Sequence, residues 1–285
     1  MTGHAHRIPP VSQPRPGTLH VVATPIGHRD DISARAIETL RKVKVIAAED
    51  TRHTRPLLQH LGIDTPLVAL HDHNERTAVD GLVERMRGGD DVALVSDAGT
   101  PLISDPGFRL VRAARAAGLK VSPVPGASAV IAALSVAGLP SDRFIFEGFL
   151  SAKSGARRSR LAELAGESRT LIFYESSHRI LESLEDMREA FGAEREAVVA
   201  RELTKMFETV LDGTLADLAA RVAADPNQQK GEFVVMVAGR AAGEDERLAE
   251  GLRVFAILKD ELPPAKAAKM AAAITGAPRK ALYGN

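Results

Sequence analysis

The segment 96–107, SDAGTPLISDPG, combines residue types that suit ligand binding. It holds two aspartates, two prolines and two glycines, and it lies between an apolar run and an amphipathic run. Small residues let a ligand approach the backbone N–H groups closely, and a carboxylate can hold a hydroxyl or an amine. The alternative is a helix-capping loop, with Asp105 as the N-cap and Pro106 at the first helical position. That alternative still leaves Asp97 available to a ligand.

Two further turns carry small residues next to apolar runs. Residues 124–129, VPGASA, end one such run and open a helix, where backbone N–H groups lack helical partners. Residues 24–27, TPIG, have the same character, and each turn by itself is also typical of an ordinary tight turn.

Glu49 and Asp50 form an adjacent pair of carboxylates. On a strand, adjacent side chains face opposite sides, which disfavours a shared acid–base site.

One cluster has the residue types of a metal site. His71, His73 and Glu75 lie close together in LHDHNE, and imidazoles and a carboxylate at alternate positions can converge on a metal ion. We favour a polar loop that faces the ligand crevice, and we predict no metal.

Basic side chains form two groups that could contact phosphate. The first lies on 47–55, AAEDTRHTR, which we expect to be a crevice loop, and comprises Arg52, His53 and Arg55. The second is the densest basic run of the second half and comprises Lys153, Arg157, Arg158 and Arg160. Each group is also typical of solvated charges at a helix start. The second group gains a phosphate-binding role if its segment overhangs the crevice.

The elements that must position these residues alternate between short apolar strands and amphipathic helices. Apolar runs at 19–27, 45–50, 66–70, 91–99 and 119–126 are separated by helical patterns. This alternation predicts a parallel sheet covered by helices on both faces. Ligands bind such sheets beyond the carboxyl ends of the strands, where the turns described above lie.

The chain changes character twice after this region. From about residue 140 it is richer in strands, and we expect a second αβ domain that is partly antiparallel. After Arg240 the composition shifts to Ala, Lys and Glu, with one helix expected on each side of Pro263 and Pro264 and the second closed by Gly276. The predicted organisation is a flexible tail over 1–17, αβ domains over 18–139 and 140–240, and a helical extension over 241–285.

Composition excludes several classes of protein. The 285 residues include 37 Lys+Arg and 37 Asp+Glu, so nucleic-acid binding must depend on a local basic patch. Cysteine is absent from the sequence, which excludes disulfides, thiolate metal sites and a cysteine nucleophile. The sequence lacks a G-x-G-x-x-G fingerprint and a P-loop, which disfavours the usual dinucleotide and NTP sites, and it lacks the G-x-S-x-G elbow of hydrolases. It has no apolar run of about 20 residues, so we expect no membrane segment.

Seven motifs in order resemble the ribosomal RNA small subunit methyltransferase I family of the tetrapyrrole methylase superfamily. They are TPIGHRDDIS, AAEDTRHT, LHDHNE, SDAGTPLISDPG, VPGASA, FYESSHR and RELTKMFE, and the resemblance covers roughly 18–239. It implies an α/β fold of two αβ domains with S-adenosylmethionine in the cleft between them, followed by a small helical appendage. It further implies a cytoplasmic homodimer that methylates the 2′ oxygen of a cytidine ribose in the decoding region of 16S rRNA within the small ribosomal subunit.

The resemblance also assigns residues. It places the cofactor contacts on three turns of the first domain and three positions of the second: Pro25, Gly27, Asp97, Ala98, Gly99, Thr100, Ala127, Ser128, Ala129, Tyr174, Glu175 and Leu203. Asp97 matches the aspartate of the superfamily's G-D-P motif, whereas Ser96 and Ala98 replace its neighbours. The pattern of enzymes that act on tetrapyrroles is therefore not met.

Methylation of a ribose hydroxyl benefits from a proton acceptor, because such hydroxyls ionise far above neutral pH. The crevice carboxylates available are Asp50, Glu75, Asp97 and Glu147, and the sequence does not choose among them. The two basic groups defined above are the candidate RNA contacts. Two alternatives stay open: a C-methyltransferase that acts on a tetrapyrrole, and a ribosome-assembly factor without enzymatic activity.

Overall fold

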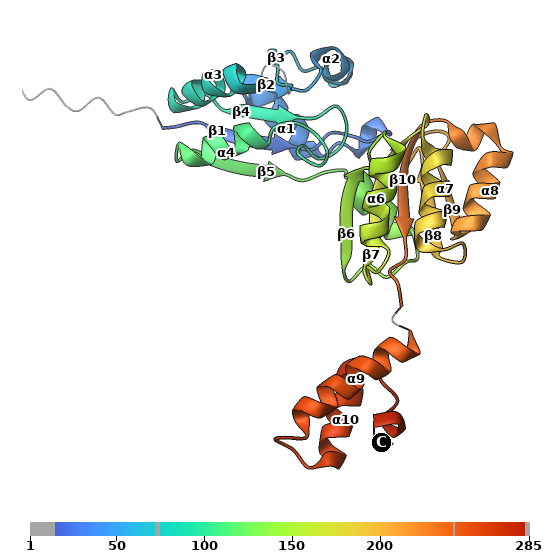
Figure 1. Ribbon diagram of the computed structural model, residues 1–285. Helices are drawn as coiled ribbons and strands as arrows, with labels where there is room; N and C mark the ends of the chain where they lie inside the picture. The colour runs from blue at the N-terminus through green and yellow to red at the C-terminus, as the bar shows by residue number, and fades with distance from the viewer. Residues whose placement is uncertain (1–14, 72–74, 242, 283–285) are drawn as a thin grey trace, which may run out of the picture.

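The structure is a computed structural model that describes residues 15–71, 75–241 and 243–282, with the backbone alone at 75–76 and 244–246. It contains two αβ domains and a C-terminal helical unit, as the sequence predicts (Figure 1). Of the tail predicted over 1–17, residues 1–14 lie outside the described residues.

The first domain is built on a five-stranded sheet with the order β3-β2-β4-β1-β5. Every strand pair is parallel, with Leu19 opposite Val92 and Ile46 opposite Leu67. The strands are β1 (Thr18–Val22), β2 (Val45–Ala48), β3 (Leu67–Ala69), β4 (Val92–Val95) and β5 (Lys120–Val124). The predicted parallel sheet is confirmed, and its carboxyl ends carry the turns that the sequence singled out.

Helices cover both faces of this sheet. The short helix η1 (Arg29–Asp31) precedes α1 (Ala34–Lys42), which packs with α2 (Thr51–His60) on one face. The other face is covered by α3 (Glu75–Arg87) and α4 (Phe108–Ala116). Apolar side chains at helical spacing make these faces, as Leu40 and Leu58 show in the α1–α2 layer.

Helix α2 corrects one prediction. The sequence analysis treated 47–55 as a crevice loop, but 47–48 belong to β2, and the prediction is wrong from Thr51 onward because the helix begins there. Asp50 is its N-cap, with Oδ1 accepting a hydrogen bond from the Arg52 N–H at 2.8 Å. The basic residues Arg52, His53 and Arg55 therefore stand on the first turns of a helix, which was the alternative interpretation.

The second domain has a mixed five-stranded sheet with the order β6-β7-β10-β8-β9. The β6–β7 pair is parallel and the other pairs are antiparallel, so the predicted partly antiparallel sheet is confirmed. The strands are β6 (Phe144–Phe149), β7 (Thr170–Ser176), β8 (Glu196–Arg201), β9 (Thr209–Thr214) and β10 (Glu232–Val237).

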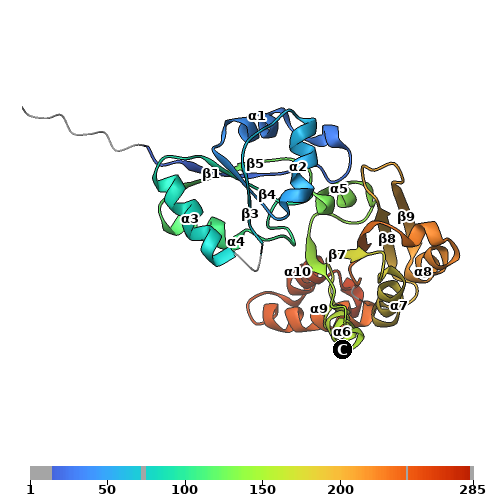
Figure 2. The same cartoon turned by 90° about the horizontal axis from the view of Figure 1, so that it is seen from above.

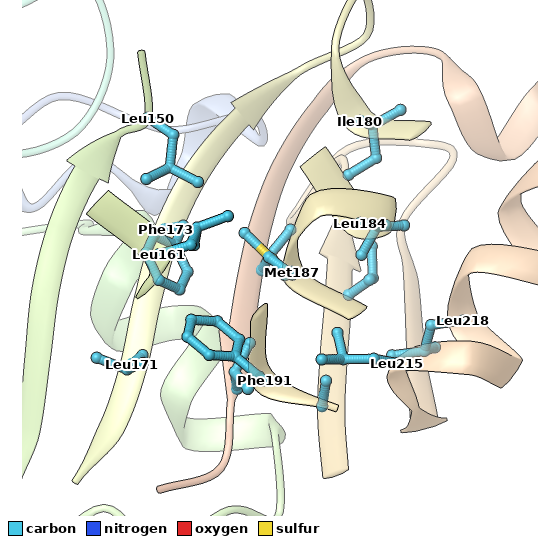
Figure 3. Close-up of a cluster of buried hydrophobic side chains, with 14 of the residues drawn as sticks. Leu150, Leu161, Leu171, Phe173, Ile180, Leu184, Met187, Phe191, Leu215 and Leu218 are labelled. Carbon is cyan, nitrogen blue, oxygen red and sulfur yellow. The ribbon is translucent and has the colours of Figure 1, made fainter. Parts of the chain in front are cut away.

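Both faces of the second sheet are buried. Phe173 and Ile172 are successive residues of one strand, so they point to opposite faces. On one face Phe173 packs with Leu184 and Met187 under the helices (Figure 3). These helices are α6 (Ser154–Leu164), α7 (Ile180–Phe191) and α8 (Leu215–Ala224), followed by the short helix η2 (Pro226–Gln229). On the other face Ile172 packs against α5 (Ala129–Val136).

Helix α5 joins the two domains. The sequence analysis drew its boundary after this helix, at 139, but Val130, Ala133 and Leu134 bury themselves against the second sheet. The packing of the chain therefore changes from the first sheet to the second before α5 (Figure 2).

The C-terminal unit is a helical hairpin with its own small core. Helix α9 (Glu244–Leu258) packs against α10 (Pro264–Thr275), and η3 (Arg279–Leu282) closes the unit through Leu282. Pro264 opens α10 and Gly276 ends it with a φ of 71°, as the sequence predicts. Figure 1 shows this unit set apart from the αβ domains, and no helix in the described ranges is long and apolar enough to cross a membrane.

Candidate active site

A cavity of about 550 Å³ lies between the two domains, beyond the carboxyl ends of the first sheet. Its walls are the loop between β4 and α4, the start of α5, the loop between β7 and α7, and the segments around β8 and β10. Small-molecule sites typically measure about 300–1,000 Å³. The cavity therefore has the size of a small-molecule site and lies where the sequence predicts the ligand crevice.

Hydrogen bonds tie the first-domain walls together. The backbones of Thr24 and Gly99 bond each other in both directions, at 2.9 and 3.1 Å. The Thr100 hydroxyl donates to the carbonyl of Ala127 at 2.9 Å. These bonds hold the turn 24–27, the loop 96–107 and the start of α5 as one wall.

Backbone strain gathers at the loops that line the cavity. Among the residues that the structure describes, four other than glycine adopt positive φ: Leu102 (74°), Ser104 (67°), Glu202 (50°) and Thr204 (61°). The first pair lies between β4 and α4, and the second pair follows β8. Such conformations cost about 1–3 kcal/mol each and persist where the surrounding structure fixes them. The surrounding structure therefore holds both loops in one geometry.

Asp105 belongs to the cavity wall and not to a helix cap. Helix α4 begins at Phe108, and its N-cap is Gly107, with a φ of 119° and no side-chain cap bond. The capping role weighed for Asp105 and Pro106 is therefore wrong. Partial burial raises the pKa of Asp105 to about 6; a hydrogen bond with Ser96 opposes this shift, and the neighbouring carboxylate of Asp97 adds to it.

Aromatic side chains form the opposite wall. Tyr174 lies edge-on to Phe149, with ring centroids 5.4 Å apart, and both side chains line the cavity. Burial raises the pKa of Tyr174 to about 12, so its phenol stays protonated at neutral pH, with a backbone hydrogen bond from Val130 as the opposing effect. Such a wall suits a flat ring or a cation, which aromatic faces attract.

Comparison with known proteins identifies the family. Residues 18–219 match the model of the Tetrapyrrole (Corrin/Porphyrin) Methylases, and residues 245–284 match the RsmI C-terminal HTH domain. A Xylella fastidiosa (strain Temecula1) protein named ribosomal RNA small subunit methyltransferase I is 66% identical over 269 residues, which cover 94% of this chain and 98% of that protein. Proteins of the same name from Pseudomonas aeruginosa and Escherichia coli O157:H7 are 62% and 54% identical, cover 94% of this chain each, and are themselves covered to 95% and 93%.

This chain belongs to the ribosomal RNA small subunit methyltransferase I family. Solved structures agree with the fold: the methyltransferase CobJ superposes with a TM-score of 0.58 at 22% identity, covering 80% of this chain and 97% of that one. The cobalt precorrin-4 methyltransferase CbiF gives a TM-score of 0.56 at 18% identity, covering 78% and 94%. At these identities the likeness concerns the architecture alone.

Most residues that the family resemblance assigned to the cofactor line the cavity. They are Asp97, Ala98, Gly99, Thr100, Ser128, Ala129, Tyr174, Glu175 and Leu203. Pro25, Gly27 and Ala127 are not among the residues that line the cavity. A Cβ atom on Gly27 would lie 2.6 Å from the Thr204 hydroxyl and 2.9 Å from the Leu203 carbonyl. The two domains therefore approach so closely at this position that a larger residue would clash.

Glu175 lines the cavity with its carboxylate already engaged. Its oxygens accept hydrogen bonds from the Ser183 hydroxyl at 2.6 Å and from the Ser176 N–H at 2.8 Å. Arg179 pairs with it at 3.0 Å, and the Glu175 side chain is fully buried. This arrangement fixes the loop after β7.

The candidate proton acceptors differ in whether they line the cavity. Asp97 lines the cavity, and its Oδ1 accepts a hydrogen bond from the Asp50 N–H at 3.1 Å. Asp50 is outside the described lining and pairs with Arg52, which lowers the pKa of Asp50 to about 2. Glu147 is also outside it and binds Arg160 through both oxygens at 2.9 Å. The Glu75 side chain and His73 fall outside the described residues, so the LHDHNE cluster is not described as a whole.

One candidate RNA contact needs correction. The Arg157 side chain is 2% exposed and pairs with Asp186 at 2.6 Å and with Glu182 at 3.3 Å. It cannot reach a phosphate without leaving a buried partner, so its role is to hold α6 against α7. Arg158 and Arg160 keep partial exposure but also pair with carboxylates, and Lys153 is exposed at the start of α6.

The sequence analysis missed several lining residues. They are Ser104, Phe149, Ser176, Ser177, His178, Lys205 and Glu232, together with Glu49, which was weighed only in a pair with Asp50, and Asp105, which was weighed as a cap. Ser176–His178 lie inside the FYESSHR motif, and Lys205 lies in RELTKMFE, so the motifs themselves were the available signal. Lys205 pairs with Glu202 at 2.9 Å and with Glu232 at 2.8 Å, which joins the loop after β8 to β10.

Proposed function

We propose that this protein transfers a methyl group from S-adenosylmethionine to the 2′ oxygen of a cytidine ribose in the decoding region of 16S rRNA. The observation that carries the proposal is the similarity to proteins named ribosomal RNA small subunit methyltransferase I, at up to 66% identity over both αβ domains and the helical unit. We further propose that it acts on the small ribosomal subunit, as a homodimer, in the cytoplasm.

The cavity fits S-adenosylmethionine in size and chemistry. The small residues Ala98 and Gly99 leave room at the backbone, and Thr100 keeps that turn in place. Asp97 and Asp105 line the same wall and can attract the cation and the ammonium group of this cofactor. When bound, S-adenosylmethionine supplies a methyl group on a sulfonium, whose sulfur keeps the bonding electron pair and becomes a neutral thioether.

The residues of the chain contribute mainly by positioning. The bonded loops and their strained conformations fix the walls before a ligand arrives, which reduces the entropy lost on binding. Good alignment of two reacting groups can lower a barrier by about 7–11 kcal/mol.

The C-terminal unit supports RNA as the substrate. Between Pro263 and Leu282 the chain has four basic residues, Lys266, Lys269, Arg279 and Lys280, and no acidic residue. Lys266 and Lys269 are exposed on α10, whose opposite face packs on α9 through Ala267, Ala268 and Ala271. A basic helix in a helix-turn-helix unit is typical of phosphate contact in nucleic-acid binding. Arg52, His53, Arg55 and Lys153 are exposed and are proposed as further contacts.

Exposed apolar side chains support the homodimer. Met206 and Phe207, in the loop between β8 and β9, are 90% and 65% exposed. Large apolar side chains exposed together often mark protein–protein contacts. Sedimentation at micromolar concentration should give twice the chain mass, and a Met206→Ser, Phe207→Ser variant should shift toward the monomer.

Methyl transfer to purified ribosomal subunits tests the function. With tritiated S-adenosylmethionine, we expect small subunits to become labelled. Ribonuclease treatment should release this label, and protease treatment should not. Large subunits and a tetrapyrrole precursor serve as parallel acceptors. A folded protein that binds the cofactor yet labels neither small subunits nor naked 16S rRNA contradicts the proposal, and label in the tetrapyrrole would establish the alternative enzyme.

A further inference from the structure

We propose that Lys205 binds a phosphate of the RNA beside the target ribose, at the open edge of the cavity, and that Glu232 occupies this position in the free protein. The inference rests on the proposed function and names a substrate contact that the family resemblance did not assign. Three features of the structure carry it: the charge of the cavity lining, the rigid loop that presents Lys205, and the exposure of Glu232.

The first feature is the charge of the lining. Five carboxylates line the cavity, and the described lining contains one lysine, Lys205, and no arginine. The carboxylates belong to Glu49, Asp97, Asp105, Glu175 and Glu232. Like charges repel at short range, so most of this lining disfavours a phosphate. A nucleotide that enters the cavity therefore meets a favourable place for its phosphate at Lys205.

The second feature is the loop after β8, which holds Lys205 from both domains. Glu202 and Thr204, on either side of Leu203, adopt positive φ. The Thr204 hydroxyl accepts a hydrogen bond from the His28 N–H of the first domain at 3.0 Å. The Lys205 N–H donates to the Glu202 carbonyl at 3.0 Å. The backbone of Lys205 is thus fixed relative to the first-domain wall before RNA arrives.

Glu202 anchors the Lys205 side chain. Its Oε1 accepts hydrogen bonds from the Lys205 ammonium at 2.9 Å and from the Glu232 N–H at 3.0 Å. The Glu202 side chain is 17% exposed, and a Cβ atom on Gly231 would lie 2.5 Å from its carboxyl carbon. This carboxylate has little room to move, so it holds the ammonium in one place.

Lys205 stays a cation in this setting. Burial lowers the pKa of its ammonium, but hydrogen bonds to Glu232 and Glu202 and the charges of these carboxylates outweigh burial, so the pKa is raised. The group therefore does not serve as a proton acceptor at neutral pH. An ammonium has three N–H donors, and the two carboxylates use two of them.

The third feature is the exposure of Glu232. Its carboxylate accepts a hydrogen bond from Lys205 at 2.8 Å, yet the Glu232 side chain is 77% exposed and stands at the open edge of the cavity. Water screens ion pairs of exposed side chains, so they contribute little to stability. A phosphate offers an anionic oxygen to the same donor and can replace Glu232, while Glu202 keeps its bond to Lys205.

The open edge favours RNA phosphate over the other anion of the reaction, the carboxylate of S-adenosylmethionine. A polynucleotide reaches a cavity between two domains only through its open edge, and the target ribose has a phosphate on each side. Lys205 belongs to the second-domain wall, whereas the turns proposed for the cofactor lie mainly on the first-domain wall. Binding of the cofactor carboxylate by Lys205 is an outcome that the test separates.

A Lys205→Gln variant tests the phosphate contact, because glutamine removes the charge and keeps an N–H donor for Glu202. We expect its affinity for small ribosomal subunits to fall by about 10-fold. The slope of log affinity against log salt should become smaller by about 0.7–0.9 in magnitude, the value for one phosphate. Lys205→Arg, which keeps the charge, should retain the wild-type slope.

The matched control is Lys42→Gln. Lys42 pairs with Glu38 on the exposed surface of α1, and its side chain is 73% exposed. This variant should keep the wild-type affinity and slope. An unchanged slope in Lys205→Gln, or the same reduced slope in Lys205→Arg, overturns the proposal.

A Glu232→Gln variant tests the competition. Removing the carboxylate that occupies the phosphate position should strengthen binding to small subunits by about threefold to fivefold, the range of an exposed ion pair. The gain should disappear when Lys205→Gln is also present, because Glu232 then has no ammonium to occupy. A gain of the same size in both backgrounds indicates general charge repulsion and overturns the competition.

Calorimetry with two cofactor analogues distinguishes the two anions. Lys205→Gln should bind S-adenosylhomocysteine and 5′-methylthioadenosine, which lacks the amino-acid part, within about threefold of the wild type. Weakening of S-adenosylhomocysteine alone by about 10-fold would assign Lys205 to the cofactor carboxylate and overturn the phosphate contact.

Two comparisons keep the test decisive. If Lys205→Gln does not fold, Glu232→Gln alters an exposed side chain and still has to bind small subunits more tightly than the wild type, and equal binding overturns the proposal. Wild-type protein that methylates no rRNA refutes the proposed function itself, whereas an active wild type with an unchanged salt slope in Lys205→Gln refutes this inference alone.

Discussion

Replacing Arg157 with methionine separates a structural role from an RNA-binding role. The guanidinium bonds Asp186 Oδ2 at 2.6 Å and Glu182 at 3.3 Å, and the side chains of Arg157 and Asp186 are 2% and 4% exposed. Methionine keeps the length of the side chain but removes its charge. The Arg157→Met variant therefore leaves Asp186 buried with one fewer partner.

The expected loss of stability follows from this geometry. Removing one partner of a buried ion pair costs about 3–5 kcal/mol. Arg158 still bonds Asp186 Oδ1 at 2.7 Å, so Asp186 keeps one cation. We expect the lower end, about 3 kcal/mol, which corresponds to a fall in Tm of about 6–12 °C for a protein of this size.

Urea unfolding at pH 7.5 and a salt titration of RNA binding measure the two roles. The neighbouring Arg158→Met variant is the control: its side chain is 56% exposed, and it should lose about 1 kcal/mol or less. Arg157→Met should leave the salt dependence of RNA affinity unchanged. A variant as stable as the wild type, with a slope of log affinity against log salt that is smaller by about 1, would refute the buried-pair interpretation.

Three more predictions follow from the site and the helical unit. Gly27→Ala should weaken S-adenosylhomocysteine binding by about 10-fold in calorimetry, because its Cβ atom would push the loop after β8 away from the cavity; unchanged affinity would contradict the interdomain cavity. Asp105→Asn should stabilise the free protein by about 1 kcal/mol above pH 6 in urea unfolding. The raised pKa of Asp105 opposes folding when the group is ionised, so this gain should disappear as pH falls toward 4, and a gain that persists at pH 4 would contradict the argument. Lys266→Ala combined with Lys269→Ala should reduce the slope of log RNA affinity against log salt concentration by about 2 in magnitude, without changing cofactor affinity. An unchanged slope would show that α10 does not contact the RNA.

Local patterns were sufficient for the framework of the protein. Apolar runs separated by amphipathic stretches predicted the parallel sheet, and the sheet placed the loop 96–107 and the turn 124–129 at the carboxyl ends of its strands. Proline and glycine marked the ends of α10 because their conformational limits act within one or two residues. Family motifs then identified nine residues of the cavity lining.

Features that depend on distant parts of the chain were missed. Arg157 belongs to a basic run in sequence, but its partner Asp186 lies 29 residues away on another helix. Helix α5 follows the last strand of the first sheet, yet its apolar side chains are buried by strands formed later in the chain. Asp105 has the sequence of a capping residue, and the positive φ of Gly107 that removes this role is set by packing of the loop.

Nucleotide-resolution mapping of 2′-O-methyl groups in 16S rRNA tests the central claim most directly. The rRNA would come from cells lacking this protein and from the same cells carrying the wild-type gene. We predict that one decoding-region cytidine is methylated with the wild-type gene and unmethylated without it. Identical methylation in both would contradict the account.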